Sequence, residues 1–301
     1  MDCALDAWSA LGRRRRIGGH ELFVIDSGES DRPALLLIHG FPTSSWDWAP
    51  LWDALSASHR LIAFDLLGFG FSDKPDPHDY RISEQADLCE AVLGDLGLSE
   101  ADLIAHDYGD TVAQELLARQ NEGRSPIHWR SVCLLNGGLF PETHRPRLIQ
   151  KLLAGPLGPL LNRLTSKQRF DTTLRAIFGP ETPPGQDLLD GYWRLLNHGG
   201  RRAPTHRLLD YIRERRLHRK RWLDALIYSE VPIGLINGSA DPISGAHMVA
   251  RYRELIPRDD FIVELPRIGH FPQVEAPSRV VEAYRNFLRS RGRRVAARAF
   301  C

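Results

Sequence analysis

The stretch that decides the fold is Leu103-Ile104-Ala105-His106-Asp107-Tyr108-Gly109-Asp110. Residues 102–106 have the apolar character of a buried strand, and residues 109–118 are predicted to form a helix. Between them, the small residues Ala105 and Gly109 flank an acidic residue at a sharp turn. A strand-to-helix turn of this kind presents one side chain above the edge of a sheet. The sequence therefore predicts that the carboxylate of Asp107 is displayed there, with Gly109 allowing the helix to pack close to the sheet.

A carboxylate at this position favours a particular chemistry. A serine would attack carbonyl carbons and form acyl esters, whereas a carboxylate attacking a carbonyl would give a labile anhydride. The productive targets of a carboxylate are saturated carbons that carry a leaving group, such as the carbons of epoxides and alkyl halides. Asp107 therefore predicts cleavage of C–O or C–halogen bonds through an alkyl-enzyme ester. The alternative is that Asp107 is an ordinary helix N-cap.

Two later loops supply an acid and then a histidine, in the order that such a hydrolase needs. Residues 231–236 are a predicted strand that runs into Asp241-Pro242, and residues 261–265 are another that is followed by His270. Both side chains follow the carboxyl end of a strand, on the sheet edge where Asp107 is expected. The pKa of an ordinary histidine lies near neutrality, so His270 suits the role of general base, with Asp241 orienting it. Asp241 also fits a plain Asp-Pro turn.

The loop after the predicted strand 34–38 is expected to stabilise a developing oxyanion. It reads His39-Gly40-Phe41-Pro42, and the backbone amide of Phe41 is one predicted donor. The amide of Tyr108 is the other. His39 is expected to brace this loop. Asp65 and Asp73, in a glycine-rich loop, are expected to fix local backbone hydrogen bonds and to have no catalytic role.

Composition narrows the function classes. The chain has 301 residues with 43% hydrophobic content, enough for one large α/β domain with an insertion. The formal net charge of +1 gives no reason to expect a nucleic-acid partner. The four cysteines are scattered without metal-ligand spacing, and no phosphate-binding loop is present. We therefore expect no metal, no cofactor and a reducing, cytoplasmic setting.

The basic run Arg13-Arg14-Arg15-Arg16 invites a targeting interpretation. No apolar segment follows it, and residues 17–20 are predicted to form a turn between two strands instead, so a secretory or twin-arginine signal is not expected. No apolar stretch reaches the roughly 18 residues that a membrane span needs. We expect a soluble protein with no membrane partner. Its oligomeric state is left open.

Strands and helices alternate along most of the chain, which predicts βαβ crossovers and a mostly parallel sheet. The predicted strands are residues 21–25, 34–38, 60–64, 102–106, 131–135, 231–236 and 261–265. The predicted helices are residues 48–57, one that Ser83 caps, residues 109–118 and residues 277–289.

The pattern changes in residues 140–228, where proline and glycine separate short helical pieces and strand signals disappear. We predict a helical cap there, inserted into an α/β core formed by residues 1–139 and 229–301. The cap holds 17 Lys and Arg against 8 Asp and Glu. This excess indicates either attraction of an anionic substrate or simply a solvated basic surface.

Three motifs resemble the epoxide hydrolase and haloalkane dehalogenase branch of the α/β-hydrolase superfamily. They are residues 39–45, 65–75 and 106–110. Within that branch the chain is most similar to the mesoderm-specific transcript protein subfamily, on residues 105–117 and 136–146. The resemblance extends from about residue 25 to residue 288. It implies the α/β-hydrolase fold, with a mostly parallel eight-stranded sheet, helices on both faces and an inserted helical cap.

The resemblance also implies roles. Asp107 would form the alkyl ester, and His270, oriented by Asp241, would activate the water that hydrolyses it. The related dehalogenases hold halide with a Trp after the nucleophile and an Asn in the oxyanion loop, but this chain has Tyr108 and Phe41 there. Epoxide hydrolases protonate the opening oxygen with cap tyrosines, usually two, and Tyr211 is the candidate for one.

The second tyrosine has no match, because residues 140–191 contain no Tyr. His144 and Tyr192 are the available substitutes. The leading hypothesis is an epoxide hydrolase-like enzyme that converts a small electrophilic epoxide and water to a vicinal diol. The alternatives are a dehalogenase acting on haloalkanes or halogenated carboxylates, and a non-catalytic α/β-hydrolase-fold binding protein.

Overall fold

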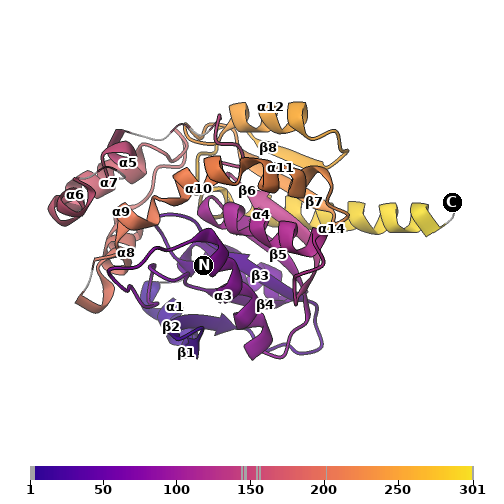
Figure 1. Cartoon of the computed structure of the whole chain (residues 1–301), viewed down its shortest axis with the longest axis horizontal. Coiled ribbons are helices and arrows are strands. Elements are labelled where there is room, and N and C mark those ends of the chain that lie inside the picture. Colours follow the sequence, from indigo (N-terminus) through magenta and orange to yellow (C-terminus); the bar gives the residue numbers. More distant parts are fainter. Residues whose placement is uncertain are drawn as a thin grey trace.

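A single eight-stranded sheet organises the chain (Figure 1). The computed structural model describes residues 4–143, 145, 148–153, 155, 157–200 and 202–299. The strands are β1 (Arg13–Ile17), β2 (His20–Asp26), β3 (Ala34–Ile38), β4 (Arg60–Phe64), β5 (Glu100–His106), β6 (His128–Leu135), β7 (Ile233–Gly238) and β8 (Phe261–Leu265). Their order is β1-β2-β4-β3-β5-β6-β7-β8, antiparallel across β1, β2 and β4 and parallel from β4 to β8. The predicted α/β fold with a mostly parallel eight-stranded sheet is confirmed.

Alternate residues of the central strands face opposite sides of the sheet, and helices cover both sides. Leu36 and Leu103 belong to one apolar cluster, whereas the neighbouring Leu35 and Ile104 belong to another. Elements outside residues 140–228 are α1 (Leu5–Leu11), η1 (Ser45–Leu51), α2 (Trp52–Ser56), α3 (Ile82–Asp95), α4 (Tyr108–Asn121), α12 (Ala246–Leu255), α13 (Pro272–Glu275) and α14 (Pro277–Ala299). Every residue of β3 is buried, as a contiguous apolar run in a two-sided sheet requires.

The described residues of the segment 140–228, called here the helical insertion, form helices and loops between β6 and β7, which pair directly. They are α5 (Leu148–Leu153), α6 (Gly158–Leu164), α7 (Lys167–Arg175), α8 (Gln186–Leu196), η2 (His198–Gly200), α9 (Thr205–Leu208), α10 (Tyr211–Leu217) and α11 (Arg219–Ile227). Figure 1 shows α10 and α11 close over α4, with α5 to α7 further out. The indole of Trp222 on α11 donates to Glu115 on α4 at 2.9 Å.

The basic run at residues 13–16 lies in a β-hairpin, as predicted. Gly18 and Gly19 join β1 to β2 with φ values of 59° and 86°. Positive φ at both central positions is the conformation of a type I′ hairpin turn, which glycine adopts without strain. In the described part of the chain, no helix has both the length and the apolar character needed to cross a membrane.

Two helix predictions need correction. Ser83 does not cap α3, because the helix already begins at Ile82. The amide of Ile82 donates to the carboxylate of Glu214 at 3.3 Å, so a partner from the helical insertion satisfies a donor at this end instead of a local side chain. The single helix predicted for residues 48–57 is a 3-10 helix followed by a short α-helix. Pro50 lacks the N–H that one continuous α-helix would use there.

The close packing of α4 against the sheet gives a stability prediction. A Cβ added at Gly109 would lie 2.7 Å from the carbonyl oxygen of Ile38 and 2.8 Å from that of His39. We expect Gly109→Ala to lower the free energy of unfolding by about 1–3 kcal/mol, because backbone atoms cannot move aside as a side chain would. Urea denaturation of the purified variant measures this.

Gly94→Ala is the matched control. Gly94 lies in α3, and a Cβ there would meet nothing within 4 Å. This substitution should raise the free energy of unfolding by about 0.4–1 kcal/mol. Equal effects of the two substitutions would contradict the close-approach argument.

Candidate active site

Asp107 occupies the turn between β5 and α4 in an uncommon backbone conformation. Its φ and ψ are 47° and −102°, and its side chain makes no capping hydrogen bond to the helix that it precedes. The interpretation of Asp107 as a plain N-cap is therefore wrong. Residues in such sparsely populated conformations persist only when the surrounding structure imposes them. The carboxylate is held away from the helix amides and is 3% exposed.

Phe41, whose amide was predicted to be an oxyanion donor, lies beside this carboxylate. The Phe41 amide donates to Asp107 Oδ2 at 3.1 Å. Gly40 permits the approach, since a Cβ there would lie 2.9 Å from the Cβ of Asp107. Tyr108 begins α4 directly after Asp107, and its side chain is buried. His39 braces the loop as expected, because its Nε2 accepts the amide of Leu66 at 3.0 Å.

Asp65 and Asp73 hold backbone groups, as predicted. Asp65 accepts the amides of Ser45 at 2.8 Å and Phe71 at 2.6 Å. Asp73 accepts the amide of Glu21 at 2.8 Å.

Asp241 and His270 form a buried pair opposite Asp107. His270 Nδ1 lies 2.8 Å from Asp241 Oδ2, and His270 Nε2 lies 3.9 Å from Asp107 Oδ2. Asp241 also accepts the amides of Ile243 at 2.8 Å and Ser244 at 3.1 Å. The structure thus brings together the three side chains that sequence order predicted, with the free ring nitrogen of His270 directed toward Asp107.

The charges of this pair stabilise each other. Burial alone would lower the pKa of His270, but the negative charge of Asp241, its hydrogen bond and the charge of Asp107 raise that pKa to about 9. Burial acts to raise the pKa of Asp241, but the positive charge of His270 and the hydrogen bonds from His270, Asn136 and the Ile243 amide together outweigh burial, so that pKa is lowered. In the resting protein at neutral pH the pair is therefore an imidazolium beside a carboxylate.

Backbone hydrogen bonds fix the position of His270. Its amide donates to the carbonyl oxygen of Ile177 in the helical insertion at 2.9 Å, and its carbonyl oxygen lies 2.8 Å from His106 Nε2. Burial, followed by the charge of His270, lowers the pKa of His106 to about 3. His106 is therefore neutral, and its Nε2 carries the proton that it donates to this carbonyl.

Glu275 connects the His270 loop to the helical insertion. Its Oε2 accepts the amides of Gly269 at 2.9 Å and Gly179 at 2.7 Å, and its Oε1 accepts the amide of Phe271 at 2.9 Å. One carboxylate thus binds the residues on both sides of His270 and a residue of the insertion. This role was not predicted from the sequence.

Asn136 was also missed as a site residue. It follows β6 with a φ of 46°. Its Nδ2 donates to Asp241 Oδ2 at 3.0 Å, and its Oδ1 accepts the amide of Gly238 at 2.7 Å. The signal for it was present in the sequence, because Asn136 follows a predicted strand on the same sheet edge as Asp107 and precedes Gly137-Gly138.

The least expected residue is Arg215 of α10, a cation that is 1% exposed. It donates to the carbonyl oxygen of Asp107 at 3.1 Å and to Thr111 Oγ1 at 2.8 Å, and its Nη2 lies 3.8 Å from Asp107 Oδ1. Its guanidinium also lies over the ring of Tyr211, 4.4 Å from the centroid. Tyr211 and Arg215 are one helical turn apart, and that i,i+4 spacing was the available sequence signal.

A cavity of about 120 Å³ opens beside these groups. Its walls are mainly apolar, with Asp107, His270, Tyr211 and Phe41 among them. Other lining residues are Leu153, Leu161, Phe170, Leu174, Ile177, Leu196 and Ile243, with Gln150, Asn162 and Arg169 as polar members. An enclosed apolar space with a few convergent polar groups is typical of a small-molecule site.

Of the two candidate tyrosines, Tyr211 and Tyr192, only one lines the cavity. Tyr211 lines the cavity, and burial raises its pKa further above the ordinary value of a phenol, so it keeps its proton. Tyr192 is not among the lining residues, and its ring packs against Trp46 and Phe271 instead. His144 lies outside the described residues. The structure thus places Tyr211, and not Tyr192, where it can contact a bound molecule.

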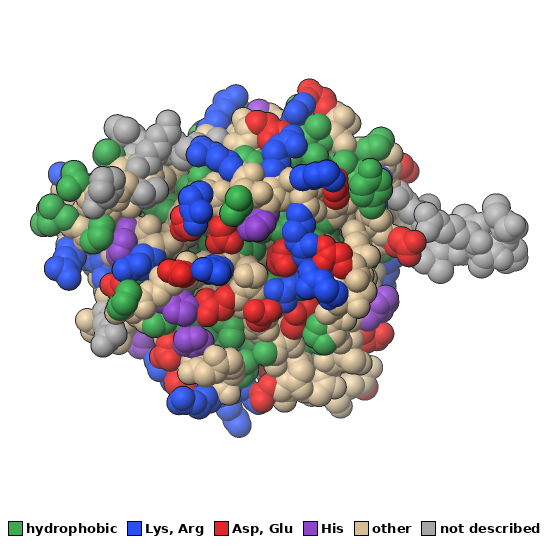
Figure 2. All heavy atoms as spheres, viewed as in Figure 1, with side chains coloured by type: hydrophobic (Ala, Val, Ile, Leu, Met, Phe, Trp, Pro, Cys, Tyr) green, Lys and Arg blue, Asp and Glu red, His purple; other side chains and the backbone are tan. Residues whose placement is uncertain are grey.

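Most of the basic side chains that the structure describes in the helical insertion form ion pairs. Arg207 contacts Asp76, Arg219 contacts Glu142, and Arg221 contacts Glu115 at N–O distances of 2.8, 2.5 and 3.1 Å. Basic and acidic side chains alternate over the face shown in Figure 2. These pairs favour the solvated-surface interpretation of the basic insertion. Arg169 is the basic residue that reaches the cavity wall.

Comparisons with known proteins agree with this architecture. A sequence profile described as the alpha/beta hydrolase family matches residues 35–283. The chain is 44% identical over 296 residues to the mesoderm-specific transcript homolog protein of Bos taurus, covering 95% of this chain and 88% of that protein. It is 27% identical over 270 residues to haloalkane dehalogenase 2 of Mycobacterium bovis, covering 87% and 89%. A crystal structure of a haloalkane dehalogenase DbeA loop variant from Bradyrhizobium elkanii superposes with a TM-score of 0.79 at 22% identity, covering 95% and 99%.

The raised pKa of His270 predicts a pH-dependent contribution to stability. A histidine whose folded-state pKa of about 9 exceeds its ordinary value of 6.5 stabilises the fold fully below about pH 6.5 and loses that contribution as pH rises through 9. The free energy of unfolding of the wild type minus that of His270→Gln should therefore fall between pH 6.5 and pH 9. Urea denaturation at several pH values measures it.

His128→Gln serves as the control for general effects of pH, since His128 is an exposed residue at the start of β6. The free energy of unfolding of the wild type minus that of His128→Gln should change much less between pH 6.5 and pH 9. A His270→Gln difference that stays constant with pH would contradict the assignment of a charged His270.

Proposed function

The chain belongs to the alpha/beta hydrolase family, and from that premise we propose that it is a hydrolase whose Asp107 forms an alkyl-enzyme ester. The preferred reaction is epoxide opening to a vicinal diol. One observation carries the proposal: the Asp107 carboxylate lies at the wall of an apolar cavity, between the Phe41 amide and the buried Asp241–His270 pair. In this proposal the helical insertion acts as the cap that closes the cavity.

In the first step, a carboxylate oxygen of Asp107 attacks a ring carbon of the epoxide, and the C–O bond of that carbon breaks. Oδ2 already accepts the Phe41 amide, which suits it to become the carbonyl oxygen of the ester and leaves Oδ1 as the attacking atom. The electron pair of the broken bond stays on the substrate oxygen. Tyr211 lines the cavity with a protonated phenol and supplies the proton that this oxygen takes up.

In the second step, protonated His270 first gives its proton back to the Tyr211 phenolate through solvent, and the neutral ring then removes a proton from water. The resulting hydroxide attacks the carbonyl carbon of the Asp107 ester. The Phe41 and Tyr108 amides stabilise the tetrahedral oxyanion, a contribution of about 3–4 kcal/mol for one such donor. Collapse of the intermediate breaks the ester bond, and the departing alkoxide takes the proton of the added hydroxyl group, which restores the Asp107 carboxylate and releases the diol. Asp241 keeps the ring of His270 oriented through the bond to Nδ1.

Ester formation prepares the base for this step. The negative charge of Asp107 is one of the causes of the raised pKa of His270. Esterification removes that charge, so the pKa of His270 falls from its resting value and the ring loses its proton more easily. His270 is thereby converted to its neutral, basic form before it acts on water.

Dehalogenation of a halogenated carboxylate is the second candidate, because Arg169 places a cation in the cavity wall. The same Asp107 and His270 chemistry would release halide and leave a hydroxy acid. Phe41 and Tyr108 lack the indole and amide N–H groups that bind halide in the dehalogenases that the sequence resembles, which favours the epoxide.

The nucleophile assignment can be tested by trapping. His270→Gln should form the ester but fail to hydrolyse it, so intact-mass spectrometry after incubation with epoxides and haloalkanes should show a stable adduct. The added mass distinguishes the classes, since an epoxide adds its whole mass and a haloalkane adds its alkyl group. Asp107→Asn in the same background should remove the adduct.

An adduct that survives Asp107→Asn would place the nucleophile elsewhere. If no member of the panel modifies His270→Gln while the variant keeps the wild-type circular dichroism spectrum, the non-catalytic binding protein becomes the better hypothesis.

The role of Tyr211 gives a prediction that separates the two leaving groups. Tyr211→Phe should slow formation of the alkyl ester from an epoxide by about 10²–10⁴-fold, the usual contribution of a general acid. It should leave a halide-releasing reaction nearly unchanged, because halide needs no proton. Single-turnover mass measurements in the His270→Gln background report this step directly.

Tyr228→Phe is the matched control, because Tyr228 follows α11 and is 71% exposed. It should react with epoxides at the parent rate. Unchanged epoxide opening in Tyr211→Phe would remove Tyr211 from the mechanism.

A further inference from the structure

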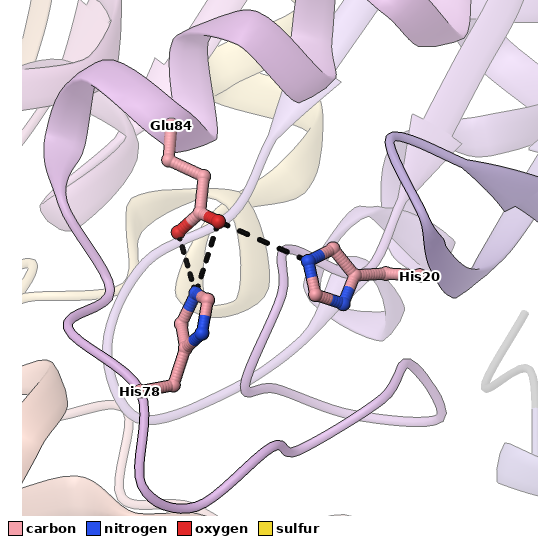
Figure 3. Close-up of side chains that lie close together, drawn as sticks. All are labelled: His20, His78 and Glu84. Atoms are coloured by element: carbon pink, nitrogen blue, oxygen red, sulfur yellow. Dashed lines mark hydrogen bonds and ion pairs between the residues drawn. The ribbon is translucent and has the colours of Figure 1, made fainter.

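Three potential metal ligands converge beside the β1–β2 hairpin (Figure 3). They are His20, the first residue of β2, His78 in the loop between β4 and α3, and Glu84 in the first turn of α3. Among the residues that the structure describes, these three form the group of His, Cys, Asp or Glu side chains whose ligand atoms all lie within 4.8 Å of one another. None of the three lines the cavity beside Asp107.

The reactive atoms face one another. His78 Nε2 lies 2.9 and 2.8 Å from the two oxygens of Glu84, and His20 Nε2 lies 3.8 Å from Glu84 Oε1. Two imidazole nitrogens and a carboxylate oxygen bound to Zn²⁺ at about 2.0–2.2 Å would be about 3.3 Å apart in a tetrahedron. Small side-chain rotations would bring these atoms from their present separations to that spacing.

The backbone holds two of the ligands before any ion binds. The Gly18-Gly19 turn fixes His20 at the start of β2. The His78 loop is folded on itself, because the buried Tyr80 contacts the His78 ring edge-on at 4.8 Å and its hydroxyl donates to the Pro75 carbonyl. Preorganised ligands reduce the entropy cost of closing a site.

The same loop is tied to the strand that carries His20. The amide of Glu21 donates to Asp73 Oδ2 at 2.8 Å, and the amide of Asp73 donates to the Glu21 carbonyl at 2.9 Å. The side chains of His20, His78 and Glu84 are 22%, 24% and 30% exposed, so an ion can reach them from solvent.

We propose that His20, His78 and Glu84 bind a Zn²⁺ ion, with water as the fourth ligand. Two imidazoles and one carboxylate match the preference of Zn²⁺ for nitrogen and oxygen ligands in a four-coordinate site. This site could not be predicted from the sequence, because its ligands are separated by 57 and 5 residues and follow no metal-binding spacing.

The bound ion would act as a structural brace. It would join the hairpin, the loop before α3 and the first turn of α3. That turn also receives the helical insertion, since the Ile82 amide donates to Glu214, the neighbour of Arg215. The ion would therefore stabilise the part of the core on which α10 docks, without contacting the cavity.

A metal-free explanation also exists and gives different results. In that explanation His78 simply hydrogen-bonds to Glu84, and the protein binds no Zn²⁺ at any pH. Metal binding instead needs deprotonated imidazoles and weakens as pH falls. Zn²⁺ affinity at different pH values distinguishes the two explanations.

The test uses the full-length protein without a histidine tag, stripped of metal with a chelator and dialysed. Isothermal titration with Zn²⁺ should show one equivalent bound, and Co²⁺ should give the visible absorption of a four-coordinate site. His78→Ala and Glu84→Gln should each weaken Zn²⁺ binding by at least about tenfold, the lower bound for losing even an outer partner of a metal site. His128→Ala and Glu230→Gln, at exposed positions elsewhere, should bind as the wild type does.

A second measurement guards against misfolded variants. In ¹⁵N-histidine NMR spectra of the wild type, one equivalent of Zn²⁺ should shift two imidazole Nε2 signals. In His20→Ala and in His78→Ala, only one signal should shift. Absence of one-equivalent binding would overturn the proposal. Binding that persists at wild-type strength in His78→Ala and Glu84→Gln would overturn it equally.

Discussion

The rest of the site depends on the backbone turn at Asp107. A φ of 47° and a ψ of −102° in a residue with a side chain cost about 1–3 kcal/mol. The surrounding structure enforces this conformation: β5 is paired on both sides, by β3 and β6, and the Asp107 amide donates to the Leu135 carbonyl at 3.1 Å. Gly109 then lets α4 lie against the carbonyls of β3. A relaxed turn would lose the contact of Asp107 with the Phe41 amide.

The charges buried around this turn are balanced in a way that accounts for Arg215. Asp110 is buried next to the turn, and burial followed by the charge of Asp107 raises its pKa well above the ordinary value, which favours its neutral form. Asp107 and Asp241 then face two cations, Arg215 and the protonated His270. Buried charges persist only when paired and hydrogen-bonded. If Asp107 becomes an ester, one negative charge disappears, and loss of the proton from His270 restores the balance. In the proposed function, Arg215 is on this argument a residue that positions Asp107.

Predictions from the sequence were most accurate where the local residue pattern and the tertiary packing favour the same secondary structure. Residues 34–38, 60–64 and 261–265 form strands with the predicted bounds, because short apolar runs in a parallel sheet are marked by turn residues at both ends. Asp107, Asp241 and His270 meet because parallel strands present their carboxyl ends at one edge. The predictions failed where a side chain distant in the sequence determines the local structure or completes the site. Glu214 satisfies the start of α3, and Arg215 enters the site from a run of arginines typical of a solvent-exposed helix. The three residues at the hairpin converge only through tertiary folding.

The position of Arg215 also limits how a substrate can enter. Its bonds to Asp107 and Thr111 and its contact with Tyr211 tie α10 to the core, while Trp222 and Glu115 tie α11 to α4. Moving α10 away would separate Arg215 from Asp107 and leave a buried charge unpaired, which costs several kcal/mol. The other cavity walls, around Gln150, Leu161 and Arg169, come from α5 to α7, which lie further from the sheet (Figure 1). In the proposed function, entry through that side would preserve the buried pairs and bring a substrate past Arg169 before it meets Asp107. The tightly bonded helices would then hold the reacting groups in place, and the outer helices would form the entrance.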